Sequence, residues 1–227
     1  MIVYIHASDM EDRGMAFRRH RGLSDVHHIT LTPFPDFNEI IPAVIAALPG
    51  QRSLYLLVVN CHGVNVPNHY GPDHPAIGLA LSQGPALPPS DLGIFAGLRG
   101  YFSDVNQGIE LHACQIARGR HGRAYCMRLA NEAGVTVYGG LDSQNGTGPG
   151  FDTDDGHLFA RWCGEVDSWG YYEGPVLAFE PGGTFHDASA ALRARGAWRA
   201  GTPELAHHRD ITAWQADNPL DEPDVSL

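Results

Sequence analysis

The chain contains no lysine, so all 15 of its cationic residues other than histidine are arginine, and 26 acidic residues outnumber them. The net charge of −11, with histidine neutral, repels phosphate backbones and predicts no nucleic-acid partner. No apolar run approaches the roughly 18 residues that span a bilayer, and the first residues resemble no secretory signal. We therefore expect a soluble, cytoplasmic protein with no membrane partner. Export without a cleaved signal stays open.

Cysteine is also scarce, because the chain has only four, at Cys61, Cys114, Cys126 and Cys163. Their wide and irregular spacing matches neither a disulfide scaffold nor a paired C-x-x-C zinc site. The 13 histidines allow a zinc interpretation, but no H-E-x-x-H spacing supports it. We therefore predict neither metal nor cofactor. The zinc alternative would use these residues: Cys61, His62, His69, His74 and Cys114.

The chain is composed like a globular protein, with 43% apolar and 18% charged residues. Short apolar runs alternate with helical patterns, which predicts an α/β fold: a three-layer sandwich with a mostly parallel six-stranded sheet and helices on both faces. We expect one α/β domain to cover residues 1–185, followed by an appendage at 186–227 that is partly helical and ends in a disordered acidic segment. The expected strands are 2–6, 28–32, 54–59, 108–113, 135–138 and 176–180, and the expected helices are 36–48, 91–102, 120–133 and 188–200. Asp36 is the expected N-cap of the first helix, Gly134 should follow the third, and Pro181-Gly182-Gly183 should end the last strand.

Some single residues also have an expected place. Glu110, His112 and Cys114 alternate along one strand and should share a face. His27 and His28 are expected at the surface. The expected core thiols are Cys61, Cys126 and Cys163.

Two of these apolar runs end in residues that carry chemistry. The run from residue 54 ends in His62 and Gly63, and the run from residue 108 ends in Cys114. Neighbouring parallel strands deliver the residues at their carboxyl ends to one edge of a sheet, where a thiol and its base can meet. Gly63 has no Cβ, so its backbone N–H, with that of Cys114, could form an oxyanion hole. The pattern predicts a His62/Cys114 catalytic dyad.

The hydrophobic block before His62-Gly63 and the block before Ala113-Cys114 resemble the two signatures of caspase-like cysteine peptidases of clan CD. The residues after Cys114 are most similar to bacterial members, the CHAT-type and adhesin-associated caspase-like domains. The resemblance covers roughly residues 53–182. It implies a caspase/hemoglobinase fold, His62 as general base or acid, Cys114 as nucleophile, a protein or peptide substrate and no cofactor.

The same resemblance implies which residues bind the substrate. His112 stands where caspases have Gln and metacaspases have Asp, so it leaves the preference for acidic or basic side chains open. Family members often build the specificity pocket after the strand expected at 135–138, where this chain has an acidic group that could attract Arg or Lys. The expected substrate-binding residues include His112, Asp142 and Asp154, and the acidic group as a whole contains Asp142, Asp152, Asp154 and Asp155.

These observations favour a cysteine endopeptidase, with self-processing left open. The alternative is a non-catalytic caspase-like module that binds or supports other parts of a bacterial system. A third interpretation keeps the dyad for another acyl transfer such as deamidation. Taken singly, His62 would be a structural histidine and Cys114 a buried core thiol. Their joint placement with Gly63 is what favours catalysis, and Cys61 is a weaker alternative nucleophile.

Overall fold

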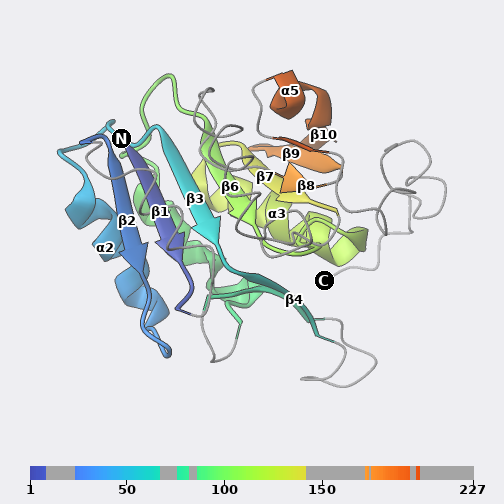
Figure 1. Cartoon of the computed structure of the whole chain (residues 1–227), viewed down its shortest axis with the longest axis horizontal. Coiled ribbons are helices and arrows are strands. Elements are labelled where there is room, and N and C mark those ends of the chain that lie inside the picture. Colours follow the sequence, from blue (N-terminus) through green and yellow to red (C-terminus); the bar gives the residue numbers. More distant parts are fainter. Residues whose placement is uncertain are drawn as a thin grey trace, which may run out of the picture.

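A seven-stranded sheet forms the centre of the computed structural model, which describes residues 1–8, 24–66, 76–81, 86–141, 172–173, 175–194 and 198–199. The strand order is β10-β9-β7-β6-β3-β1-β2, and Figure 1 shows it in reverse from left to right. The strands are β1 (Ile2–His6), β2 (Val26–Thr30), β3 (Leu56–Asn60), β6 (Gly108–His112), β7 (Val137–Gly140), β9 (Val176–Glu180) and β10 (Thr184–Asp187).

Five neighbouring strands of this sheet are parallel to one another, as the alternation of strands and helices predicts: β2, β1, β3, β6 and β7. All five residues of β1 and of β3 are buried. Their nearly continuous apolar sequences are typical of parallel strands covered on both faces. The α/β class and the mostly parallel sheet are therefore confirmed, while the finer caspase-like arrangement stays a prediction.

The prediction of six strands was wrong, because the chain adds β10 as an antiparallel edge strand beside β9. β9 itself runs antiparallel to β7. We expected Pro181-Gly182-Gly183 to end the last strand of the sheet. Instead Gly182 and Gly183 adopt positive φ angles of 101° and 100°, a conformation open to glycine, and reverse the chain into a hairpin. The expected domain boundary after residue 185 stays a prediction.

Three helical elements follow the predicted pattern: α2 (Phe37–Ala47), the 3₁₀ helix η1 (Pro89–Leu98) and α3 (Gly119–Ala133). The Asp36 side chain accepts a hydrogen bond from the Asn38 N–H and caps α2, as expected. Gly134 ends α3 in the left-handed conformation, with φ 73°, as expected of a residue after a helix. The segment expected to be an ordinary helix at 91–102 is instead the shorter η1.

The three helices share one apolar core with one face of the sheet. Val3, Ile5, Ile109 and Leu111 point into that core, whereas their neighbours along the strands point to the opposite face. On that opposite face the described residues form two smaller clusters around Tyr4 and Tyr172. Among the described residues, α2, η1 and α3 all belong to the first face, so the helical layer expected on the second face stays a prediction.

Two small sheets accompany the main one. β4 (His62–Val66) and β5 (Ala76–Ala80) pair as an antiparallel hairpin, which continues from β3 away from the main sheet in Figure 1. β8 (Tyr172–Glu173) pairs with β11 (Trp198–Arg199), and the short helix α5 (Ser189–Ala194) follows β10. Within the described ranges, no helix has the length and apolar character needed to cross a membrane.

Candidate functional site: the strand ends that carry His62 and Cys114

The ends of β3 and β6 are neighbours, as the sequence predicts. The two strands pair in parallel, with Asn60 opposite His112, and the Cys61 N–H donates to the His112 carbonyl at 3.2 Å. His62 and Cys114 each follow this last pair by two residues. The His62 side chain is exposed and Cys114 is partly buried, so both lie where the sheet edge meets the surface. His62 is the first residue of strand β4.

Gly63 brings the two strand ends into direct contact. A Cβ atom on Gly63 would lie 1.8 Å from the Cys114 carbonyl oxygen and 2.7 Å from its backbone nitrogen, far inside contact distance. Any side chain at this position would force the two backbones apart. The sequence suggested that Gly63 leaves room for a substrate, but the structure gives an additional reason for glycine. The start of β4 packs on the backbone of Cys114.

The turn that carries Cys114 is held on both sides. Gln115 adopts a positive φ of 53°, which is uncommon for a residue with a side chain and marks a sharp change of direction. The Ala117 N–H donates to the carbonyl of Gly140 at the end of β7, and the Arg118 N–H donates back to Gln115. On the α3 side, a Cβ on Gly122 would lie 2.6 Å from the Ile116 carbonyl oxygen, so the helix also packs closely against the turn.

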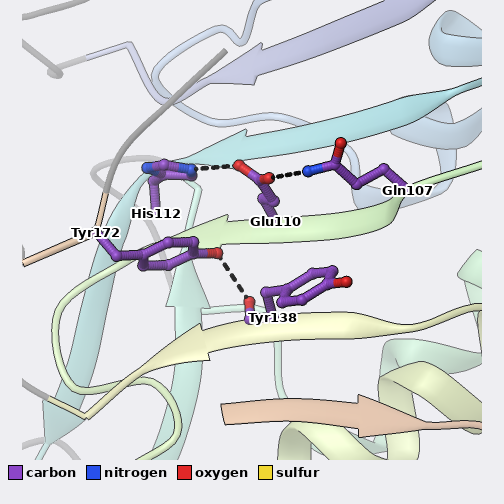
Figure 2. A network of polar contacts seen from close by, with 5 residues as sticks. All are labelled: Gln107, Glu110, His112, Tyr138 and Tyr172. Atoms are coloured by element: carbon purple, nitrogen blue, oxygen red, sulfur yellow. Dashed lines mark hydrogen bonds and ion pairs between the residues drawn. The ribbon is translucent and has the colours of Figure 1, made fainter. Parts of the chain in front are cut away.

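A buried carboxylate lies directly behind this turn. The Glu110 side chain is completely buried, and both of its oxygens are hydrogen-bonded. The Gln107 amide donates to one oxygen at 2.9 Å, and Nε2 of His112 contacts the other at 3.0 Å (Figure 2). An isolated buried carboxylate is costly, so these contacts explain how β6 can carry one within the sheet. The sequence placed Glu110 and His112 on one face but did not predict this network.

Tyr172 covers the His112 ring from the other side. The two rings stack with centroids 4.6 Å apart, and the Tyr172 hydroxyl donates to the Tyr138 carbonyl at 3.0 Å (Figure 2). Burial, and then the charge of Glu110, raise the pKa of the Tyr172 hydroxyl, so it stays a neutral donor. A hydrogen bond to Glu110 thus holds the edge of the His112 ring, and stacking on Tyr172 holds one of its faces. Nothing in the local sequence around Tyr172 indicates this contact.

A second polar cluster lies on the same face, across β1, β2 and β3. His6 is completely buried, and its ring nitrogens contact His28 at 2.9 Å and Asn60 at 3.2 Å. Tyr4 stacks on both imidazoles. Burial, and then the neighbouring His27, lower the pKa of His28 to about 4. We interpreted His28 as a surface residue, which the half-buried ring contradicts. The missed signal was in β1, where Tyr4 and His6 alternate with apolar residues.

The remaining candidates divide into three groups. Cys61 and Cys126 are buried, as expected of core thiols, and burial raises the pKa of Cys126. Among the described residues, no group of three or more His, Cys, Asp or Glu side chains could hold a metal ion. The other predicted residues lie outside the described ranges: His69, His74, Asp142, Asp152, Asp154, Asp155 and Cys163.

Comparisons with known proteins add no family assignment. No protein-family model matches the chain, and no curated protein or solved structure is significantly similar to it. Arguments about function therefore depend on the residues at the strand ends.

Proposed function

We propose that the protein is a cysteine peptidase in which Cys114 is the nucleophile and His62 transfers the protons. The single observation that carries the proposal is the close packing of Gly63 on the Cys114 backbone, which holds the residue after His62 against the nucleophile turn. The order and spacing of the two signatures, which resemble those of caspase-like peptidases, support the same function. A protein or peptide is the substrate, and no cofactor takes part.

The chemistry follows from these three residues. His62 accepts the thiol proton, and the Cys114 sulfur uses the released electron pair to attack the carbonyl carbon of the scissile peptide. The backbone N–H groups of Gly63 and Cys114 donate to the oxygen that becomes negative. His62 then gives its proton to the departing amine. Water hydrolyses the resulting thioester and returns the free thiol.

Peptide-library cleavage by the full chain, together with labelling by an iodoacetamide or peptidyl electrophile, tests the proposal. Cys114→Ala should abolish cleavage and remove the labelled site. His62→Ala should slow cleavage by about 10²- to 10⁴-fold, because a general acid–base is lost. Both variants remove side chains at the partly or fully exposed edge of the sheet, so the fold should be retained, which circular dichroism checks.

Cys126→Ala is the matched control, because this second thiol lies on the buried face of α3 and should not react. Labelling that persists in Cys114→Ala, or cleavage that is insensitive to His62→Ala, would contradict the proposal. A Cys114 thiol that reacts with no electrophile, in a chain that cleaves no peptide, would favour the non-catalytic module.

A further inference from the structure

Helix α3 joins the nucleophile turn to the β4–β5 hairpin. In the turn after Cys114, the Ile116 carbonyl accepts a hydrogen bond from the Cys126 thiol at 3.7 Å. One residue earlier on the helix, the Tyr125 hydroxyl donates to the Leu87 carbonyl at 3.1 Å, and Leu87 pairs with β5. The buried face of one helix therefore contacts the segments that carry both halves of the proposed site.

The Tyr125 hydroxyl is a neutral donor in a dry environment. The side chain is 1% exposed, and burial, followed by the neighbouring Cys61 thiol, raises the pKa of the hydroxyl well above its usual value. A buried carbonyl that loses its donor costs free energy, so this hydrogen bond holds Leu87 in place. Cys61 directly precedes His62, so Tyr125 also lies close to the start of the hairpin.

Leu87 in turn fixes how β5 pairs with β4. The Leu87 N–H donates to the Leu79 carbonyl at 2.9 Å, so the polar backbone groups of Leu79 point toward Leu87. Leu79 lies opposite Gly63 across the hairpin. Residues of an antiparallel strand bond alternately to one neighbour and to the other. Leu79 and Gly63 therefore form a non-hydrogen-bonded pair, and the Gly63 N–H points away from β5.

This direction of the Gly63 N–H is the one that the proposed chemistry requires. An oxyanion donor must face the substrate carbonyl, which an N–H used inside the hairpin cannot do. A shift of the pairing by one residue would turn Gly63 toward β5, because the hydrogen-bonding side alternates with every residue. The contacts from Tyr125 through Leu87 to Leu79 therefore hold the register in which Gly63 can act.

We propose that Tyr125 is a positioning residue, which acts through Leu87 and Leu79 to direct the Gly63 N–H toward the substrate carbonyl. The inference rests on the proposed function of Cys114. It adds one role to a helix that otherwise packs the core. The Tyr125 hydroxyl should then matter for the charged intermediate and not for the reactivity of the Cys114 thiol itself.

Two reactions of Cys114 separate these effects. Peptide cleavage passes through a tetrahedral oxyanion, which needs the Gly63 N–H. Iodoacetamide is instead attacked at a saturated carbon, which forms a thioether and releases iodide with no oxyanion. Cleavage is measured as kcat and KM for the library peptide that the full wild-type chain cleaves fastest. Alkylation is measured as the rate of Cys114 labelling by mass spectrometry.

Tyr125→Phe removes only the hydroxyl. The kcat should fall by about 10- to 100-fold, less than the roughly 10²- to 10³-fold loss when an oxyanion donor is deleted, because Gly63 is displaced and not removed. KM and the rate of alkylation should stay unchanged, since neither depends on the oxyanion.

Gly78→Ala disturbs the same contact from another direction. Its new Cβ atom would lie 2.8 Å from the Leu87 carbonyl oxygen, so Leu87 must move. The kcat should fall as in Tyr125→Phe, again with unchanged alkylation. If Tyr125→Phe does not fold, which circular dichroism shows, Gly78→Ala decides alone.

Tyr55→Phe is the matched control, because it also removes a hydroxyl that forms a hydrogen bond, here to Gln107 at the start of β3, and should change neither reaction. Unchanged kcat in Tyr125→Phe and Gly78→Ala, a rise in KM alone, or an equal loss of alkylation would overturn the inference while the proposed function stands. A wild-type chain that cleaves no peptide of the library would overturn both.

Discussion

Successive side chains of β6 point into two different environments. Ile109 and Leu111 point into the apolar core under the helices, whereas Glu110 and His112 point to the opposite face and form hydrogen bonds there. All of them are buried or nearly so. The helix-covered face is thus held together by packing, whereas on the opposite face the described residues add hydrogen-bonded polar side chains to two smaller apolar clusters.

The difference extends across the sheet. On the opposite face His6 and Asn60 form a second polar cluster on β1 and β3, directly beside the β6 network, because Asn60 pairs with His112. Buried polar side chains are costly unless their partners are well placed, so they are retained where they specify structure or chemistry. We infer that the helix-covered face mainly stabilises the fold. The polar contacts of the opposite face mainly fix the position of the strand ends that carry His62 and Cys114.

The largest effect is expected when packing is removed from the helix-covered face. Leu111 is completely buried, so Leu111→Ala should lower the free energy of unfolding by about 3 to 4 kcal/mol, measured by urea denaturation. The loss comes from buried methyl groups and the cavity that they leave. The rate at which iodoacetamide labels Cys114 should not change in the molecules that remain folded.

Two outcomes of Leu111→Ala would contradict these expectations. A loss below about 1 kcal/mol would mean that this part of the core collapses freely around the smaller side chain, which close packing argues against. An altered rate of Cys114 labelling would mean that the two faces are coupled through β6 and cannot be treated separately.

The sequence predicted the helix-covered face better than the opposite one. Apolar periodicity is a local property, and it correctly placed α2 and α3 with their caps at Asp36 and Gly134. The glycine at position 63 and the order of the two strand ends were likewise visible. Pairing within a parallel sheet also follows from simple rules of connection.

The contacts of the opposite face are not local in the sequence. The Tyr172 ring meets His112 from 60 positions along the chain, and His28 meets His6 across two strands. Neither contact produces a repeat or a motif. The antiparallel β10 was missed for a different reason, because Pro and Gly residues signal a turn without saying whether the chain re-enters the sheet.

A smaller loss of stability is expected when the Glu110 carboxylate, the centre of the polar network, is removed. Glu110→Met keeps the size of the side chain but removes the acceptor shared by Gln107 and His112. Two donors then lose their partner, and the free energy of unfolding should fall by about 1 to 2 kcal/mol in the same urea experiment. The figure is lower than for Leu111→Ala because the methionine restores apolar burial.

Gln107→Met is the control for Glu110→Met, since it removes one donor and leaves the carboxylate bonded to His112. It should cost less than Glu110→Met. A cost for Glu110→Met as large as that of Leu111→Ala would contradict the division between the faces, because the fold would then depend equally on both.

The smallest effect concerns acid stability and the cluster around His28. Above pH 6.5 this imidazole is neutral in both the folded and the unfolded chain. Between pH 6.5 and about 4 the unfolded chain binds a proton at His28 while the folded chain, whose pKa is lowered to about 4, does not. The unfolded state therefore gains stability, and the melting temperature should fall as the pH decreases through this window.

His28→Phe isolates the contribution of this one group. The new ring can keep the stacking with Tyr4 but binds no proton, so the melting temperature should fall less steeply between pH 6.5 and 4 than in the wild type, even if it is lower throughout. His186→Gln, on an exposed strand residue, should leave the slope unchanged. Because His28 is only half buried, solvent screens the effect and keeps it modest. Identical slopes for wild type and His28→Phe would show that the polar cluster tolerates a charge, and that this end of the opposite face is wetter than its hydrogen bonds indicate.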